Sequence, residues 1–390
     1  MLSLIKSTFY HEKETKKALQ KFIAHASQLS FGDQCLLFEK KFAAWQKRKD
    51  CIVVNSGSSA NVAIIQALLN LKKLKKGDAV GFSAVTWSTN VMPLIELGLV
   101  PVPIDVSLET LNVSPETLAG TLKKYPLKMV FLTNLLGLCD RIDEIAAILK
   151  KQNILLVEDN CESLGSVYQG KKLGNYGLAS TCSFYVGHHL STIEGGAIVT
   201  DNAQLATMLR LVRAHGWDRN LTFSGQEKIR KKFSINSSFY SRYVFYDLGY
   251  NFRPTEIMGF LGNSQMPYLN EIVANREKNF QRLAPLLYTH PAYYPLRWDH
   301  MERISSFAFP LICRDSRMRE TIVKRCDGVV EIRPVVGGNM LSQPFYKKYF
   351  PQHSNACPNA QLIHEQGMYF GNNPELSRKD LQLYKKIFLL

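Results

Sequence analysis

The chain has 390 residues, of which 46% are hydrophobic and 21% are charged, and its formal net charge is +15. This length allows a large buried core and the composition is close to the globular average, which excludes a disordered, a fibrous and a small disulfide-stapled protein. Basic residues are spread along the chain in short clusters such as LKKLKKGD and KIRKKF, without a nucleic-acid-binding motif. We therefore expect no nucleic-acid partner.

Two further features concern location and redox state. No apolar run reaches the roughly 18 residues of a membrane helix, and the first residues, MLSLIKSTFYHEKETKK, become charged too early for a secretory signal. We expect a cytoplasmic protein with no membrane segment. The eight cysteines are scattered without a CxxC pair, which predicts reduced, mostly buried thiols and no metal site.

Short β-rich runs alternate with helical patterns from about residue 50 to residue 200. The expected strands are CIVVN, AVGFS, VPVPID, MVFLTN, ILLVED, STCSFYV and GAIVT, and helices are expected over 59–71 and 143–152. This alternation predicts an α/β fold with a parallel sheet covered by helices.

The second half of the chain has a different pattern. Pro254 is expected in the first turn of a helix that begins at PTEIM, and another helix is expected over 272–287. Beyond about residue 290, the strands FAFPLIC and VVEIRPV mix with helices. We place a boundary near residue 266, which gives a large α/β domain, 1–265, and a small C-terminal α+β domain, 266–390.

The first chemical motif is NSGSSAN, residues 55–61, which follows a strand and opens a helix. Small residues there let backbone N–H groups approach a phosphate, and the helix N-terminus adds a partial positive charge. Taken alone, the motif is more typical of an ordinary serine-capped turn.

The second motif, ILLVEDN, ends a hydrophobic strand on Glu158 and Asp159, at the carboxyl edge where α/β folds bind ligands. A carboxylate there can hold a pyridine nitrogen protonated, or Asp159 can simply cap a helix. Glu162, three residues later, can reach the same ligand or cap the turn.

The third motif is SFYVGHHLSTIEGGAIV, a strand that leads through a glycine-bearing loop into another strand. No third metal ligand of suitable spacing accompanies His188 and His189, so acid–base chemistry is favoured over metal binding. Solvated loop histidines are the alternative. For His189 we favour a packing or hydrogen-bonding role.

Together and in this order, the three motifs resemble those of the DegT/DnrJ/StrS-type sugar aminotransferases, which are pyridoxal phosphate (PLP) enzymes. The likeness extends over essentially the whole chain and includes FGDQCLLFEKKFAAW, HGWDRN, LGYNFRPTEI and GMYFGNN. It implies the type I fold of aspartate aminotransferase, with a large mixed or parallel sheet domain and a small α+β C-terminal domain.

The family's cofactor-binding lysine stands five residues after the serine of the SFY-type strand, where this chain has His188. Imidazole cannot replace the lysine in its covalent link to the cofactor. The chain therefore resembles the lysine-less subgroup of 3-dehydratases, with noncovalently bound PLP or pyridoxamine phosphate (PMP). Other lysine-less relatives carry an iron–sulfur cluster, but HGWDRNLTFSGQEKIRKK has no cysteine, so we expect no cluster.

Carried over residue by residue, the resemblance implies a cofactor site. Asp159 is expected at the pyridine nitrogen and Trp87 on the ring, with Glu162 also in contact with the cofactor. Asn251 is expected to reach the phosphate from a partner subunit, which implies a homodimer. The other expected phosphate ligands are Gly57, Ser58 and Ser183, and candidate nucleotide or sugar contacts are Arg219, Glu331, Arg333 and Asn339.

The resemblance also implies a reaction. L-Glutamate converts PLP to PMP, which acts on the C4 ketone of a nucleotide-linked 4-keto-6-deoxy sugar, and His188 serves as the base while the C3 hydroxyl leaves. The expected substrate is GDP-4-keto-6-deoxy-D-mannose, used to make a dideoxysugar of a surface polysaccharide. The alternatives are a CDP- or dTDP-linked substrate, an aminotransferase with His188 as its base, and a PLP-fold binding protein without catalysis.

Overall fold

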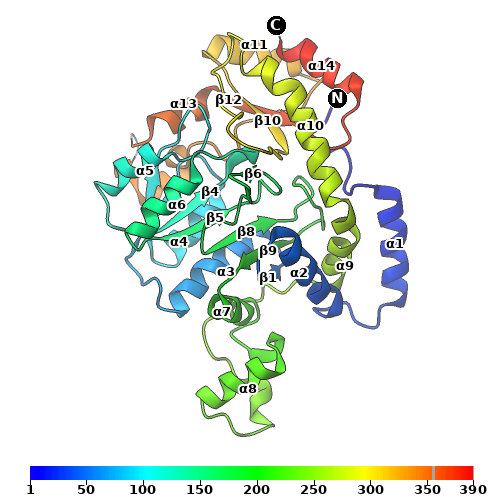
Figure 1. Ribbon diagram of the computed structural model, residues 1–390, viewed down its shortest axis with the longest axis vertical. Helices are drawn as coiled ribbons and strands as arrows, with labels where there is room; N and C mark the ends of the chain where they lie inside the picture. The colour runs from blue at the N-terminus through cyan, green and yellow to red at the C-terminus, as the bar shows by residue number, and fades with distance from the viewer. Residues whose placement is uncertain (354–355, 390) are drawn as a thin grey trace.

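The computed structural model describes residues 1–353 and 356–389. Its main sheet has seven strands in the order β1-β9-β8-β5-β4-β2-β3, and all seven expected strands are present (Figure 1). β9 is antiparallel to both β1 and β8, so the sheet is mixed. The strands are β1 (Asp50–Val54), β2 (Ala79–Ser83), β3 (Val100–Ile104), β4 (Leu127–Thr133), β5 (Leu155–Asp159), β8 (Ala179–Ser183) and β9 (Gly196–Thr200).

Alternating side chains on the strands build two cores, one on each face of the sheet. In β1, Ile52 and Val54 join the core formed with α3 (Gly57–Asn70) and α7 (Ala203–Arg213), where Ile64 is buried. Cys51 and Val53 join the core formed with α2 (Asp33–Gln46) and α9 (Glu256–Gln265). The remaining helices between the strands are α4 (Met92–Glu96), α5 (Pro115–Leu122) and α6 (Ile142–Lys151).

The predicted helix over 59–71 is α3, the one over 143–152 is α6, and the one over 272–287 is α10 (Leu269–Leu287). The position of Pro254 differs from the prediction. Helix α9 begins at Glu256, because the Thr255 side chain is its N-cap and accepts a hydrogen bond from the Met258 N–H at 3.3 Å. Pro254 therefore precedes the cap and lies outside the first turn.

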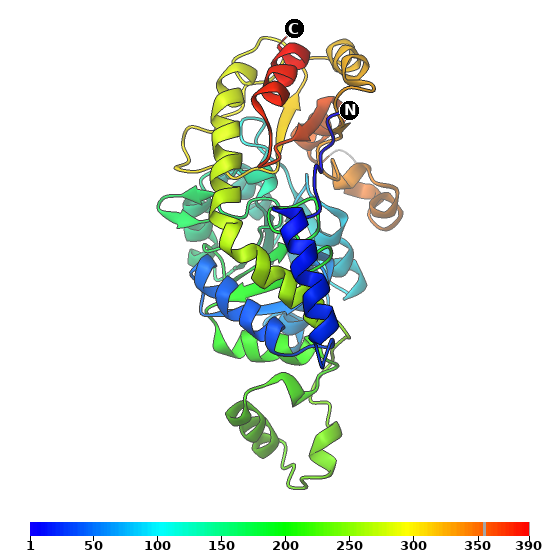
Figure 2. The ribbon, with the colours of Figure 1, turned by 90° about the vertical axis from the view of Figure 1, so that its right-hand side faces the viewer.

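A second, antiparallel sheet has the order β10-β12-β11. Figures 1 and 2 show α10 running along the molecule from the main sheet to this small sheet. Leu2 forms a bridge with Val330, so the first residues lie against the C-terminal part, although the sequence boundary groups them with the large domain. The elements of this part are β10 (Ala308–Ile312), β11 (Ile332–Arg333), β12 (Gly367–Gly371), α11 (Ser316–Cys326), α12 (Pro344–Tyr349), α13 (Pro358–Gln366) and α14 (Arg378–Phe388).

Residues 217–247 form an arm that extends from the body at the end opposite the two termini (Figures 1 and 2). The arm contains α8 (Phe223–Lys232), and the bridge between Trp217 and Phe245 closes its base. Its aromatic side chains are largely exposed, which is typical of a surface that contacts another protein. They include Phe223, Phe233, Phe239, Tyr240, Tyr243 and Phe245.

Two further features complete the fold, a helix that packs against α9 and a separate two-stranded sheet. They are α1 (Glu12–His25) and the short pair β6 (Val167–Tyr168) and β7 (Lys171–Lys172). Among the described residues, no helix is both long enough and apolar enough to cross a membrane. The cysteines are free thiols, and all except Cys161 are buried.

Candidate active site

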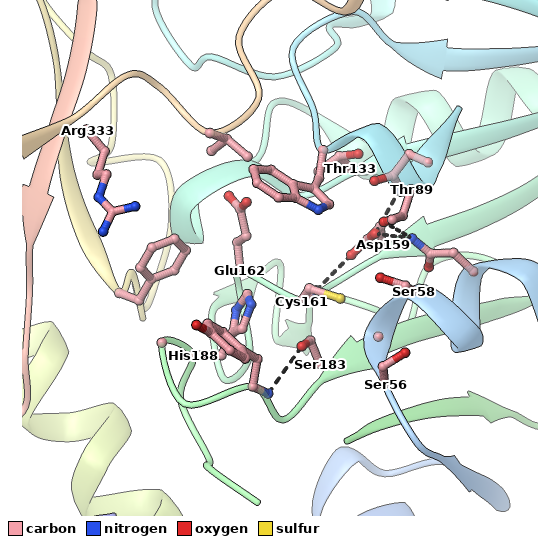
Figure 3. Close-up of a pocket in the computed structure, with 18 of the residues that line it drawn as sticks. Ser56, Ser58, Thr89, Thr133, Asp159, Cys161, Glu162, Ser183, His188 and Arg333 are labelled. Carbon is pink, nitrogen blue, oxygen red and sulfur yellow. Dashed lines mark hydrogen bonds between the residues drawn. The ribbon is translucent and has the colours of Figure 1, made fainter. Parts of the chain in front are cut away.

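The carboxyl ends of six strands, β1 to β5 and β8, lie at one edge of the main sheet. β2, β4, β5 and β8 are mutually parallel, and β1 points the same way because β1 and β8 are both antiparallel to β9. A cavity of about 550 Å³ opens at this edge (Figure 3), which is where α/β folds bind ligands. Side chains from the C-terminal part close its other side, namely Phe307, Glu331, Arg333, Val336 and Tyr369.

The N-terminus of α3 forms one wall of the cavity. Ser56 is the N-cap, and its hydroxyl accepts a hydrogen bond from the Ser59 N–H at 3.0 Å. Gly57, Ser58 and Ser183 line the cavity beside it, and a Cβ atom on Gly57 would lie 2.7 Å from the Ser183 Cβ. The first turn of α3 carries no acidic residue, so its free N–H groups and helix dipole favour an anion such as a phosphate.

Asp159, at the end of β5, is buried and points into the cavity. Its Oδ2 accepts hydrogen bonds from Asn61 Nδ2 at 3.0 Å and Asn90 Nδ2 at 2.8 Å, and its Oδ1 accepts one from the Cys161 N–H at 2.9 Å. These donors hold the carboxylate in one orientation, where it can pair with a protonated ring nitrogen.

The neighbouring carboxylate, Glu158, has a structural role. Adjacent residues of a strand face opposite sides of the sheet, and Glu158 is wholly buried away from the cavity. Its oxygens accept hydrogen bonds at 2.7–3.0 Å from the N–H groups of Gly174, Tyr176 and Gly177 and from Asn134 Nδ2.

Glu162 lines the cavity and is buried. Its Oε2 accepts a hydrogen bond from the Leu136 N–H at 3.0 Å, and its Oε1 has no hydrogen-bond partner among the described side chains and backbone groups. Desolvation raises the pKa of Glu162 to about 8. The carboxyl group therefore holds a proton at neutral pH and can donate a hydrogen bond to a ligand.

His188 lies in the loop between β8 and β9 and lines the same cavity. Its backbone N–H donates to the Tyr185 carbonyl at 2.9 Å, and its ring is 5.6 Å from the ring of Phe307. Desolvation lowers the pKa of His188 to about 4, although the charge of Asp159 opposes this shift. The imidazole is thus neutral at pH 7, and its buried Nδ1 has no hydrogen-bond partner within the described chain.

His189 points away from the cavity. It is only 3% exposed, and its Nε2 lies 2.8 Å from the Ser305 carbonyl oxygen. This position agrees with the packing or hydrogen-bonding role predicted for His189. Among the described residues that line the cavity, none is a lysine, and nowhere in the described chain do three or more potential metal ligands cluster.

The structure brings most of the predicted site residues to this cavity, but not all of them. Trp87 lines it and is 54% exposed, so it lies at the mouth instead of in the core. Glu331 and Arg333 line it as an ion pair. Three predicted residues do not line it. Arg219 stacks on Trp217 at the base of the arm, and Asn251 is exposed near that base. Asn339 is buried, and its side-chain amide donates a hydrogen bond to Gln361 Oε1 at 2.9 Å.

Sequence reasoning missed Asn61 and Asn90, the two amide donors to Asp159. A signal was present for Asn61, because a polar residue at position 61 interrupts the otherwise apolar inner side of α3, where Ala60 and Ile64 are buried. Asn90 ends a short 3-10 helix, Ser88–Asn90, after β2, and no periodic pattern marks it.

A sequence profile of the DegT/DnrJ/EryC1/StrS aminotransferase family matches residues 10–387. The chain is 34% identical over 377 residues to the GDP-4-keto-6-deoxy-D-mannose 3-dehydratase of Yersinia pseudotuberculosis, which covers 94% of this chain and 93% of that protein. It superposes with a TM-score of 0.90 on the E. coli GDP-4-keto-6-deoxy-D-mannose-3-dehydratase with bound hydrated PLP, at 31% identity and with 100% of this chain and 99% of that one covered.

A structure of GDP-4-keto-6-deoxymannose-3-dehydratase with a trapped PLP-glutamate geminal diamine gives a TM-score of 0.88 at 31% identity, with 99% of this chain and 100% of that one covered. The expected PLP-dependent transferase fold is confirmed by these likenesses, which extend over the whole length of the chain. The chain belongs to the DegT/DnrJ/EryC1/StrS aminotransferase family.

Proposed function

We propose that this chain is a PLP/PMP-dependent 3-dehydratase that removes the C3 hydroxyl of a nucleotide-linked 4-keto-6-deoxy sugar. The observation that carries the proposal is the cavity itself, which combines an anion-binding helix N-terminus, a fixed carboxylate and a neutral histidine without a lysine among its described lining residues. The relatives named as 3-dehydratases support the reaction, and the glutamate adduct of one of them supports L-glutamate as amino donor.

The residues present fit the cofactor. A phosphate fits the first turn of α3 beside Ser183, because Gly57 lacks a Cβ and so lets Ser183 approach this turn closely. Asp159 suits a protonated pyridine nitrogen, Glu162 can donate a hydrogen bond to a ring oxygen, and Trp87 offers an aromatic face at the mouth. Bound there, the cofactor supplies an amine that condenses with a ketone and a ring that accepts electrons.

His188 is the proposed catalytic base. Because its ring is neutral at pH 7 and lines the cavity, it can accept a proton there. The imidazolium that results is attracted by the charge of Asp159. It can then return its proton to the oxygen that leaves C3 of the sugar.

The lack of a lysine in this cavity favours elimination over amino transfer. A lysine would recapture the cofactor covalently and deliver a proton to the sugar carbon that bears nitrogen. Imidazole can transfer protons but cannot form the covalent link to the cofactor. Among the described lining residues of the cavity, no amine therefore competes with loss of the hydroxyl by recapturing the cofactor.

We infer that the working enzyme is a homodimer. Asn251 is exposed and lies outside the cavity of its own chain, next to Phe252, whose carbonyl accepts a hydrogen bond from the Asn55 N–H. A second copy could present Asn251 to the phosphate, and the exposed aromatic side chains of the arm suit such an interface. The cytoplasmic location and the place in surface-polysaccharide synthesis stay predictions.

The nucleotide is proposed to lie toward the C-terminal part. Arg333 is 59% exposed at its side chain although it pairs with Glu331, so the guanidinium can still contact a diphosphate. The proposed nucleotide is GDP, in line with the relatives. Arg219 and Asn339 lie outside this cavity, so Arg219 remains a candidate only if a partner subunit brings it there, and Asn339 is better explained as a helix cap.

Product analysis tests the proposal. The protein is incubated with PLP, glutamate and the GDP-, CDP- or dTDP-linked 4-keto-6-deoxy sugar, and the products are measured by mass spectrometry. We expect a sugar that has lost the C3 oxygen and carries no nitrogen, formed fastest from the GDP substrate. An amino sugar as the main product would instead establish an aminotransferase.

A further inference from the structure

Arg276, on α10, is a buried cation without a carboxylate partner. It is 4% exposed, and no Asp or Glu within the described chain forms an ion pair with it. Burial of an unpaired charge costs several kcal/mol. Because no ion pair offsets the cost of burying the Arg276 guanidinium, its burial needs a reason other than a salt bridge.

The guanidinium of Arg276 binds main-chain oxygens from two distant segments. Its Nη2 donates to the carbonyl oxygen of His188 at 3.1 Å, and its Nη1 donates to the carbonyl oxygen of Asn372. The Asn372 side chain returns a hydrogen bond to the Arg276 carbonyl at 2.9 Å and donates another to the Ser306 carbonyl at 3.0 Å. Arg276 thus joins the loop that carries His188 to the small sheet.

Neighbouring contacts strengthen this junction. Asn279, one turn along α10, donates to the Asn373 carbonyl at 3.0 Å, and His189 is within hydrogen-bonding distance of the Ser305 carbonyl at 2.8 Å. Both asparagines of the GMYFGNN motif therefore contact α10, and both histidines of the GHH motif are held through this region. His189, Asn372 and Asn373, which do not line the cavity, therefore share one junction with α10.

We propose that Arg276 is a positioning residue for the proposed reaction, holding the His188 loop against the C-terminal part so that the imidazole stays directed into the cavity. This inference rests on the proposed function of His188. The long helix α10 suits the task, because it spans both parts of the molecule (Figure 2).

Arg276 also acts on His188 through its charge. Burial is the largest cause of the lowered pKa of His188, and the positive charge of Arg276 lowers it further, whereas Asp159 raises it. Loss of the Arg276 charge should therefore allow His188 to take up a proton at higher pH. The other titratable groups around the imidazole are Cys161 and Glu162 after β5, Tyr185 and His189 on its own loop, and Tyr369 on β12. The charged residues Glu194, Glu331 and Arg333 line the same cavity.

The experiment compares Arg276→Gln with Arg276→Lys. Arg282→Gln is the matched control, because Arg282 lies on the same helix and is exposed. In Arg276→Gln we expect the pKa of His188 to rise, because a positive charge that lowers it is removed. This pKa is followed by NMR on histidine-labelled protein without substrate, and the His188 resonance is assigned with His188→Asn. At pH 7, His188 is neutral in both the wild type and Arg276→Gln. At this pH we expect kcat of Arg276→Gln to fall roughly 10- to 100-fold with little change in KM.

Arg276→Lys keeps a positive charge, so it should retain a low His188 pKa and recover part of kcat. If Arg276→Gln does not fold, the lysine variant still tests the proposal. Its buried ammonium should lose its proton at lower pH than the guanidinium, and the His188 resonance should then shift as that charge disappears. An unmoved His188 signal in both variants, or wild-type kcat in Arg276→Gln, would overturn the proposal. The titration needs no turnover, so its outcome is separate from whether the wild type deoxygenates a sugar.

Discussion

The close approach of Gly57 to Ser183 in the proposed phosphate site leads to a quantitative prediction for Gly57→Ala. The new Cβ would lie 2.7 Å from the Ser183 Cβ and 3.1 Å from its Oγ, whereas carbon atoms pack best at about 3.5–4.0 Å. The backbone at Gly57 does not require glycine, and alanine is favoured inside a helix. The expected effect is therefore steric and local.

The expected magnitude follows from this overlap. Overpacking of this kind costs roughly 1–3 kcal/mol. If relief of the clash moves the first turn of α3 away from Ser183, the same free energy is lost from cofactor binding. At about 1.4 kcal/mol per factor of ten, the Kd for PLP should rise about 5- to 140-fold.

The assay is a titration of the cofactor-free protein with PLP, followed by absorbance or intrinsic fluorescence. Gly120→Ala is the matched control, because Gly120 also lies in a helix and no atom lies within 4 Å of its added Cβ. A wild-type Kd for Gly57→Ala, or an equal loss in Gly120→Ala, would refute the assignment of this turn to the phosphate.

Four other predictions concern the groups at the cavity. His188→Asn should bind PLP with near wild-type Kd but deoxygenate at least about 100-fold more slowly, the usual contribution of a general base, as measured by single-turnover product formation. Because the pKa of Glu162 is raised to about 8, its proton is lost as pH rises through that value. Wild-type kcat/KM should decline above about pH 8, and Glu162→Gln, which stays neutral, should lack this limb; an unchanged limb would contradict the assignment. Because the pKa of His188 is lowered to about 4, an acid limb from its protonation should appear only below about pH 5. Asp159→Asn removes a hydrogen-bonded charge worth about 1.5–3 kcal/mol, so the PLP titration should show a Kd raised about 10- to 150-fold.

The sequence predicts most strands of the main sheet because their buried runs are continuous and apolar, whereas β8 (Ala179–Ser183) buries three hydroxyl side chains. It does not reveal that β9 is antiparallel. The segment from Phe184 to Gly195 separates β8 from β9 without a helix, and a loop of this length is compatible with either direction. In the structure, Ser183 at the end of β8 pairs with Gly196 at the start of β9, so the two strands are antiparallel.

The cofactor-facing residues are predictable where they lie at a strand end or a helix start. Asp159 and the turn of α3 have such positions. The choice of Asp159 over Glu158 comes from the family resemblance, because the residues alone do not show which face of β5 meets the cavity. Arg276 gives no local signal, since its partners at His188 and Asn372 are distant in sequence and offer only main-chain oxygens.

In the proposed reaction, His188 acts as the base in a cavity without a lysine among its described lining residues, and the sugar loses an oxygen atom instead of gaining an amino group. The most direct test follows an isotope-labelled amino group from glutamate through a reaction with PLP and GDP-4-keto-6-deoxy-D-mannose. We expect the label to appear in free ammonia and the 3-deoxy sugar to carry none. Label retained on the sugar at C4 would contradict it.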